Sequence, residues 1–368
     1  MNIYYENKKT VKDILATSSC KFDQPLNNQT PNKLIFGDNL SVLKALSKTY
    51  RSKIDLVYID PPFATKKKFT LTDDRANSVS NSLDGRIAYE DSLTGSDFLE
   101  FLRERLILIR ELMSDHSSIY LHIDYKIGHY VKIIMDEVFG IENFRNDITR
   151  IKCSPKNFNR KAYGNVKDLI LFYSKDKKYI WNNPRDPLTD ADIDNRFTKI
   201  NPSGRKYTTV PLHAPGETLN GETAQKWRGI FPPKGRHWRS SPSVLDKLDE
   251  EGLIEWSKNG VPRKIIYADE SSGKKRQDIW LYKDKQNLRY PTEKNSDMLE
   301  AIILASSNPG SIVLDCFCGS GSTLLAAEKN DRNWIGIDKS KEAIRVTKES
   351  ISFLENQSNF QYIEELDD

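Results

Sequence analysis

Two apolar runs, each ending in an unusual turn, constrain this chain more than any other feature of its sequence. The run 54–59 ends at Asp60-Pro61-Pro62-Phe63, and the run 311–315 is followed by Phe317-Cys318-Gly319-Ser320-Gly321 and then a helix-like segment. Both runs are typical of buried strands in a parallel sheet. Parallel strands present their carboxyl ends to one ligand crevice. We therefore expect an α/β fold in which the two turns lie at the same edge of the sheet.

The rest of the chain alternates between predicted strands and predicted helices on both sides of an irregular middle. The predicted strands are 33–36, 54–60, 118–124, 168–173, 311–315 and 334–338. The predicted helices are 40–46, 98–113, 131–139, 292–306 and 341–354. This order predicts a Rossmann-like sheet with helices on both faces. Residues 64–92 have few apolar anchors, and a loop of that length is typically a functional lid or disordered.

The irregular middle, 176–288, predicts an inserted domain of mixed structure. It is rich in proline, glycine and charged residues, and only 243–251 has a helical pattern. Residues 33–175 and 289–368 would then form one discontinuous domain. Residues 1–32 are polar and weakly patterned, which predicts a loosely docked N-terminal arm.

Charge is unevenly distributed along the chain. Residues 151–290 contain 28 Lys+Arg against 17 Asp+Glu, a net +11, whereas the remainder carries −7. Five of the six tryptophans also lie in this stretch. A basic segment with interleaved aromatics favours contact with a polyanion such as nucleic acid. The alternative is an ordinary solvated surface that happens to be basic.

Composition excludes several classes of protein. The apolar content of 38% and charged content of 29% are typical of a globular domain, and no apolar run approaches the roughly 18 residues of a membrane span. The N-terminus lacks a secretory pattern. The four cysteines are too scattered for a disulfide framework, and Cys316 and Cys318 are interpreted as small turn residues rather than a metal pair. We expect a cytoplasmic protein with no membrane contact and no metal.

The glycine-spaced turn predicts a nucleoside site. Glycines between a strand and a helix let the backbone approach a ligand closely. The following strand ends at Asp338, 23 residues after Asp315, where a carboxylate can accept both ribose hydroxyls. Leu324 occupies the third glycine position of the dinucleotide fingerprint, so a nucleoside without a pyrophosphate is favoured.

The proline-rich turn predicts chemistry on an exocyclic amine. Two prolines fix the backbone and leave their carbonyls without local donors. The Asp60 carboxylate and the Pro61 carbonyl could together hold both amine hydrogens, while the Phe63 ring stacks on a planar base. Hydrogen bonds that draw such an amine toward tetrahedral geometry restore its lone pair for attack on a methyl sulfonium.

Together these motifs make the chain resemble an amino DNA methyltransferase of the β class, similar to the modification subunits of type III and related restriction-modification systems. In that class the catalytic motif precedes the recognition region and the cofactor motif follows it, which is the order here. Further family-like stretches are 36–40, 120–124, 235–238, 277–280 and 290–294. Two positions depart from the family pattern: Asn295 and Cys316 stand where proline is frequent.

The resemblance implies S-adenosylmethionine as cofactor and double-stranded DNA as substrate, with the insert as target-recognition domain. Asp60, Pro61, Pro62 and Phe63 would be catalytic. The implied cofactor-binding residues are Asp38, Asn39, Thr292, Lys294, Asp315, Phe317, Gly319, Gly321 and Asp338. Six residues are candidates for contacting DNA: Lys66, Lys67, Lys68, Arg236, His237 and Arg239. A homodimer and a cognate restriction endonuclease are the protein partners that the resemblance allows.

The favoured activity is methylation of adenine N6 in flipped-out DNA, because Asp rather than Ser leads the catalytic motif. Cytosine N4 is the alternative base. An RNA-base or protein-glutamine methyltransferase is a weaker hypothesis, since those enzymes normally carry the glycine motif first. A non-catalytic binding subunit is opposed by the intact Asp60 and Asp338. His122 is interpreted as a satisfied sheet residue rather than a catalytic one.

Overall fold

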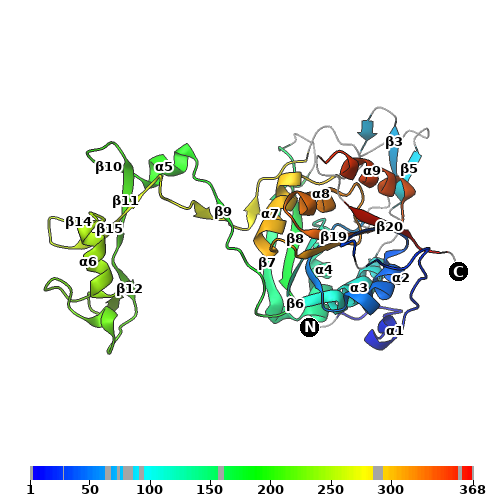
Figure 1. The fold of residues 1–368 in the computed structure, drawn as a ribbon, viewed down its shortest axis with the longest axis horizontal. Coiled ribbons are helices and arrows are strands. Elements are labelled where there is room, and N and C mark those ends of the chain that lie inside the picture. The colour runs from blue at the N-terminus through cyan, green and yellow to red at the C-terminus, as the bar shows by residue number, and fades with distance from the viewer. Residues whose placement is uncertain are drawn as a thin grey trace. The chain divides into compact units, whose positions relative to one another are not determined.

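A computed structural model describes residues 3–27, 29–62, 68–72, 75–77, 86–90, 95–155, 161–284, 293–354 and 359–366; between 68 and 90 it describes the backbone alone. The chain divides into two compact units. The first comprises Met1–Pro184 and Gln277–Asp368, and the second comprises Arg185–Arg276 (Figure 1).

A mixed sheet forms the centre of the first unit. Within the described residues its nine strands have the order β17-β7-β8-β6-β2-β18-β19-β1-β20. Neighbouring strands pair in parallel except that β8 is antiparallel to both β6 and β7. Their bounds in that order are Ile279–Trp280, Phe144–Ile151, Lys167–Ser174, Met113–Ile123, Ile54–Ile59, Ile312–Asp315, Asn333–Asp338, Asn32–Phe36 and Phe360–Glu364.

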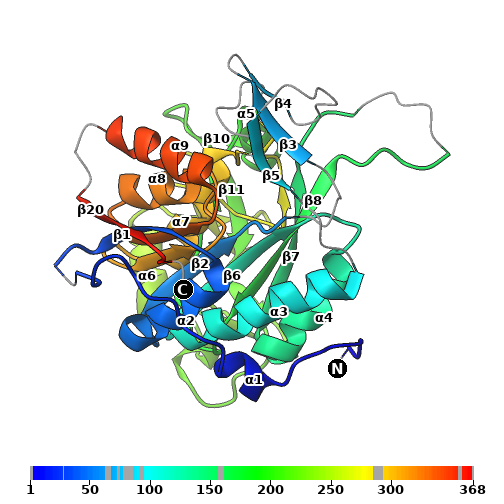
Figure 2. The ribbon, with the colours of Figure 1, turned by 90° about the vertical axis from the view of Figure 1, so that its right-hand side faces the viewer.

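Helices cover both faces of this sheet, as the sequence predicts (Figure 2). One face packs against α2 (Asn39–Tyr50), α3 (Gly95–Leu112) and α4 (Gly128–Phe139); the other packs against α7 (Ser296–Ser306), α8 (Ser322–Lys329) and α9 (Lys341–Ser352). Successive strand side chains point to opposite faces. In β2, accordingly, Val57 and Ile59 join the first core, whereas Leu56 and Tyr58 join the second.

Several elements differ from the sequence prediction. β7 and β20 are absent from the predicted strands because neither is a continuous apolar run: exposed Asn146 and Asp147 interrupt β7, and half-buried Gln361 interrupts β20. α7 begins at Ser296 rather than 292, because the Asn295 side chain caps the helix by accepting from Asp297 N and Met298 N. Part of the predicted 64–92 loop is regular: β3 (Lys68–Thr72), β4 (Arg75–Asn77) and β5 (Arg86–Glu90) form a small antiparallel sheet.

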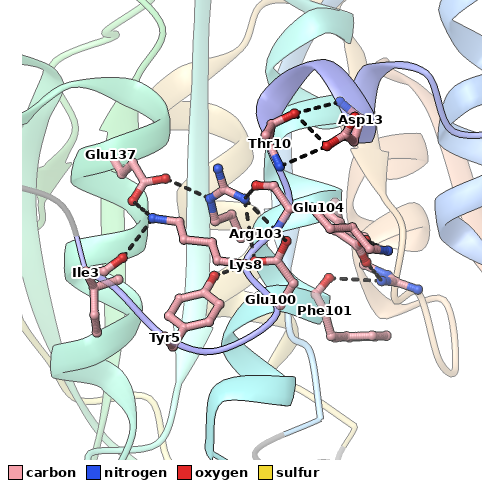
Figure 3. A network of polar contacts seen from close by, with 12 residues as sticks. Ile3, Tyr5, Lys8, Thr10, Asp13, Glu100, Phe101, Arg103, Glu104 and Glu137 are labelled. Atoms are coloured by element: carbon pink, nitrogen blue, oxygen red, sulfur yellow. Dashed lines mark hydrogen bonds and ion pairs between the residues drawn. The ribbon is translucent and has the colours of Figure 1, made fainter.

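The N-terminal segment, expected to dock loosely, is held by specific contacts (Figure 3). The Lys8 ammonium lies 2.6 Å from Glu137 Oε2, and buried Arg103 donates to Glu137 Oε1 from 2.7 Å. The Tyr5 hydroxyl donates to Glu100. The short helix α1 (Val11–Leu15) is closed by a capping box and buries Ile14 completely. The residues that make these contacts are scattered along the N-terminal segment and form no periodic pattern, so the docking could not be predicted from the sequence.

The second unit has its own small core. β10 (Lys199–Ile200), β11 (Lys206–Pro211), β15 (Pro262–Tyr267) and β14 (Ile254–Trp256) form an antiparallel sheet. Trp227 and Trp238 pack edge to face with buried Leu245 nearby. Its other elements are β9 (Arg185–Asp186), β12 (His213–Pro215), β13 (Arg236–Trp238), β16 (Lys274–Lys275), α5 (Asp190–Arg196), α6 (Pro242–Glu250) and a 3₁₀ turn at Glu222–Ala224. In the first unit a 3₁₀ turn at Ile141–Asn143 follows α4.

This unit is shorter at both ends than the predicted insert 176–288. Tyr179 and Trp181 pack on Phe172 of β8, with ring centroids 6.0 and 5.8 Å away, so the chain leaves the first unit only at Pro184. The second unit carries 17 Lys+Arg against 13 Asp+Glu, so most of the basic excess of 151–290 belongs to the first unit. Among the described helices, none has the length and apolarity needed to cross a membrane.

Candidate active site

The two turns singled out in the sequence lie side by side at one edge of the central sheet. β2 and β18 are adjacent parallel strands, with Leu56 opposite Val313 and Val57 opposite Leu314. Their carboxyl ends therefore emerge together, and the prediction of a shared edge is confirmed. Asp60 follows β2 directly, and Asp315 is the last residue of β18.

The Asp60 carboxylate has one paired and one open oxygen. Its Oδ2 lies 2.6 Å from the ammonium of Lys294, one of the implied cofactor-binding residues. Its Oδ1 is buried and has no hydrogen-bond partner among the residues that the structure describes. A buried acceptor left in this state costs about 1–3 kcal/mol, and such a cost is characteristic of a site that a ligand completes.

A buried polar network lies behind Asp60, on the neighbouring strands β6 and β8. His122 of β6 is fully buried, with Nδ1 3.0 Å from Tyr58 Oη and 3.7 Å from Asp60 Oδ1. Its Nε2 lies 3.3 Å from Asp168 Oδ2 on β8. Burial lowers the pKa of His122 and raises that of Tyr58, so the neutral forms of both are favoured.

Asp168 is the charged anchor of this network. Burial alone would raise its pKa, but hydrogen bonds from His122 and Lys152 hold it well below the usual range. Lys152 Nζ is 2.6 Å from Asp168 Oδ1, and the buried Arg150 guanidinium is 3.7 Å from Oδ2. Arg150 also donates to the carbonyl of Tyr282, 2.8 Å away.

Sequence reasoning missed Tyr58, Asp168 and Arg150 as parts of the site. All three are polar residues within mainly apolar strands, and that was the signal available for finding them. Their convergence depends on strand order, which brings β2, β6, β8 and β7 together although they are spread over residues 54–174.

The glycine turn after β18 is built for close approach of backbone. Gly319 and Gly321 have φ of +51° and +77°, values that favour glycine. A Cβ on Gly321 would lie 2.7 Å from Thr347 Cγ2, and the Thr347 hydroxyl donates to Gly319 O from 2.9 Å. The turn is thus pressed against α9 and leads directly into α8. Phe317 at its start is half-buried, with its ring centroid 6.1 Å from that of Phe101.

Asp338 ends β19 beside this turn. Its Oδ2 accepts from Gly319 N at 2.9 Å and its Oδ1 from Ser340 N at 2.8 Å. Burial raises the pKa of this partly accessible carboxyl group. Each carboxylate oxygen retains acceptor capacity beyond one backbone hydrogen bond, so the group fits the predicted contact with two ribose hydroxyls.

Two other predicted cofactor residues are occupied by structural contacts. Asp315 is buried, its Oδ1 accepts from Phe317 N at 3.0 Å, and burial raises its pKa to about 7. Asn39 donates to Cys316 O at 2.7 Å and accepts from Arg105 Nε at 2.5 Å. Both side chains therefore shape the cofactor-side turns rather than offering free polar atoms.

Asp38, by contrast, is half exposed at the amino end of α2. Its Oδ1 caps the helix by accepting from Leu40 N at 2.8 Å. The buried Arg105 guanidinium lies 3.4 Å from the same oxygen and stacks 3.6 Å over the Phe101 ring. Oδ2 accepts a long hydrogen bond of 3.5 Å from Arg105 Nη2, and about half of the side chain stays exposed.

Not every predicted site residue can be placed. Phe63, Lys66, Lys67 and Thr292 lie outside the described residues, and for Lys68 only the backbone in β3 is described. Pro61 and Pro62 follow Asp60 as buried and half-buried residues, respectively. No cluster of three or more His, Cys, Asp or Glu side chains suited to a metal ion occurs in the described ranges.

The predicted DNA-contacting residues of the insert lie on the β12–β13 hairpin of the second unit. Arg236 and Arg239 are exposed, and the Arg236 guanidinium is 3.2 Å from His213 Nδ1. Burial and the charges of these arginines lower the pKa of His213. His237 is half-buried and its Nδ1 donates to the Gly216 carbonyl at 2.7 Å.

Comparison with known proteins agrees with this site. The model of the DNA methylase family that acts on N6 and N4 amines matches residues 54–349. The type II methyltransferase M.EcaI of Enterobacter cloacae is 43% identical over 84% of this chain and 67% of its own length. The StyLTI Mod subunit of a type III restriction-modification enzyme from Salmonella typhimurium is 28% identical over 82% of the chain and 50% of its own length. M.KpnI of Klebsiella pneumoniae, a type II methyltransferase, is also 28% identical, over 82% of the chain and 77% of its own length.

The family match spans both turns, the strands that carry the buried network and the whole second unit. With its permuted motif order and its open carboxylate at the β2 end, this chain belongs to the N6/N4 amino DNA methyltransferases of the restriction-modification type.

Proposed function

We propose that the chain is a site-specific methyltransferase that modifies adenine N6 in duplex DNA with a methyl group from S-adenosylmethionine. The observation that carries the proposal is the open Oδ1 of Asp60, at the sheet edge shared with the glycine turn and Asp338. An exocyclic amine hydrogen is the kind of donor that this oxygen lacks.

The cofactor-side residues suit a nucleoside ligand. Asp338 would accept the ribose hydroxyls, Asp38 would accept the adenine amine, and the backbone of Gly319 and Gly321 would line the ligand beside the Phe317 ring. The bound cofactor supplies an electrophilic methyl group on a sulfonium. Burial of the surrounding strand ends excludes water from the reacting edge.

Asp60 would act on the target base. Its Oδ1 and the Pro61 carbonyl would accept the two amine hydrogens and orient the nitrogen lone pair, an alignment that can supply several kcal/mol of the barrier. Phe63 would stack on the base. An amine engaged in base pairing lies inside the duplex, so the nucleotide must be flipped out before reaction.

The identity of the target base is a separate part of the proposal. Asp at the head of the catalytic motif favours adenine over cytosine, since Ser at that position is commoner in cytosine-N4 enzymes. Cytosine N4 is the second candidate, because the family model covers both amines.

The second unit, 185–276, would supply target recognition. Its exposed Arg236 and Arg239 are suited to phosphate or guanine contacts. The similarity to a Mod subunit favours a restriction-modification setting with a cognate endonuclease. A second copy of the chain is a further candidate partner.

The test is to incubate the purified protein with labelled S-adenosylmethionine and mixed-sequence duplex DNA, digest the DNA and identify the labelled nucleoside by mass. N6-methyladenine is expected. N4-methylcytosine would change the base and keep the mechanism. Label that appears only in RNA, or no label despite cofactor binding, would overturn the proposal.

A further inference from the structure

The hydrogen positions in the network behind Asp60 follow from its partners. Asp168 is held as a carboxylate by Lys152 and Arg150, and a carboxylate can only accept hydrogen bonds. The His122 Nε2 facing it at 3.3 Å must therefore carry a hydrogen. In the neutral ring that burial favours, Nδ1 then has a lone pair, which accepts the hydroxyl hydrogen of Tyr58 at 3.0 Å.

This arrangement matters for Asp60 because Nδ1 is also the imidazole nitrogen that lies by its open oxygen. The distance from Nδ1 to Asp60 Oδ1 is 3.7 Å. A ring with hydrogen on Nδ1 would need only a small shift to donate to that oxygen. A ring with hydrogen on Nε2 has nothing to donate there, and Oδ1 keeps its acceptor capacity.

We propose that His122 is a positioning residue, held by Asp168 and Tyr58 in the Nε2–H tautomer so that Asp60 Oδ1 stays open to the amine of the target base. The inference rests on the proposed function and deepens it. It also accounts for a fully buried histidine in contact with two carboxylates, an arrangement that apolar packing does not require.

Within the described residues, the charged and titratable groups around the imidazole are Tyr58 and Asp60 from the β2 end, Asp168 from β8, and Lys294 from the segment before α7. Asp168 favours hydrogen on Nε2, whereas Lys294, paired with Asp60, disfavours a second positive charge on the ring. Together these charges favour a neutral imidazole whose one nitrogen-bound hydrogen is on Nε2, the nitrogen that faces Asp168.

Asp168→Asn is the decisive variant. An amide in place of the carboxylate can donate to Nε2 and so reverse the tautomer; in a serine protease triad the comparable exchange costs about 10⁴-fold in kcat. Because His122 orients Asp60 without touching the reacting atoms, we expect a fall in kcat of about 10²-fold, with cofactor Kd changed less than about twofold. Tyr120→Phe is the matched control. Tyr120 lies on β6, as His122 does, and the variant removes a buried hydrogen bond of 2.8 Å between the Tyr120 and Ser306 hydroxyls. It should leave kcat within about threefold of the wild-type value.

The tautomer itself is measured by long-range ¹H–¹⁵N NMR of the histidine rings, with His122→Gln used to assign the signal. The wild-type ring should show hydrogen on Nε2, and the Asp168→Asn ring hydrogen on Nδ1. If Asp168→Asn does not fold, Tyr58→Phe replaces it. This variant removes one of the two groups that hold the ring, so the fraction of rings with hydrogen on Nδ1 should rise and kcat should fall, by less than tenfold because Asp168 remains; no change in either would overturn the inference.

Hydrogen on Nδ1 in the wild-type protein would overturn the inference. So would a reversed tautomer in Asp168→Asn with kcat within about threefold of wild type. The NMR result is independent of methyl transfer, so failure of the proposed function, seen as wild-type protein that labels no DNA, is distinguishable from failure of this inference.

Discussion

Asp60 and Asp315 stand at the ends of adjacent parallel strands, yet their carboxylates are in opposite states. Asp60 is paired on one oxygen with Lys294 and leaves the other open. Asp315 is buried and bonded to the turn that follows it, where Phe317 N donates to its Oδ1. The first carboxylate is available to a ligand, whereas the second holds the loop that would receive one. Position at a sheet edge thus does not by itself assign an acid to chemistry.

The largest expected difference between the two is in turnover. Asp60→Ala should lower kcat by more than about 10³-fold, because it removes the acceptor that orients the amine. Its cofactor Kd should stay within about twofold. Asp315→Asn, measured in the same single-turnover assay, should retain kcat within about tenfold. Near-normal turnover of Asp60→Ala would show that the open oxygen has no catalytic role.

Asp338 extends the comparison to a carboxylate that would serve both the turn and the ligand. Asp338→Ala should weaken S-adenosylmethionine binding by about 10–100-fold, corresponding to loss of one charged hydrogen bond of about 1.5–3 kcal/mol. Isothermal titration calorimetry gives the Kd. Asp338→Asn keeps one acceptor oxygen and should lose less; equal affinity of Asp338→Ala and wild type would remove the ribose role.

The pH dependence of stability provides a third test of Asp315. Its pKa of about 7 exceeds the ordinary value of 3.8, so the native state binds the extra proton between these pH values. The free energy of unfolding should therefore fall as pH rises from about 4 to 7, by an upper limit of about 4 kcal/mol. Asp315→Asn has no carboxyl group to titrate at this position, so its free energy of unfolding should not show this fall. In thermal melts, the Tm of Asp315→Asn should rise relative to that of wild type as pH increases from about 4 to 7. A Tm difference that is the same at every pH would contradict the burial of a titrating acid.

The smallest effect is expected in the second unit. Arg236→Ala and Arg239→Ala should each weaken DNA binding and reduce the slope of log K against log salt by about 1. Lys258→Ala, an exposed lysine of the same unit, is the charge-matched control. Binding can be followed by fluorescence anisotropy from 50 to 300 mM salt; identical slopes for all three variants would remove the hairpin from the proposed interface.

Much of the fold could be predicted from the sequence because the central strands are continuously apolar. The runs ending at Asp60 and Asp315 required no other information, and the shared edge followed from parallel pairing. β7, which pairs with the short edge strand β17, and the edge strand β20 were missed because polar residues interrupt their apolar ones.

The site was less predictable for a different reason. A carboxylate's availability depends on which donors reach it, and those come from elsewhere in the chain. The partners of Asp60 are Lys294 and a network through His122 on β6. The satisfaction of Asn39 by Cys316 O and Arg105 is equally remote in sequence. Neither the partners of Asp60 nor those of Asn39 can be predicted from residue type and spacing.

The return of the chain from the second unit has a consequence for exchanging this proposed recognition unit between relatives. β17 pairs with β7, and the Tyr282 carbonyl and the Asp284 carboxylate both hold Arg150, whose guanidinium faces Asp168. Residues 277–284 therefore support the candidate active site, although they follow the second unit. A chimera in which residues 185–276 are exchanged keeps these contacts. A chimera in which residues 176–288 are exchanged would replace Tyr282 and Asp284 and so lose them. The exchangeable cassette is the shorter one.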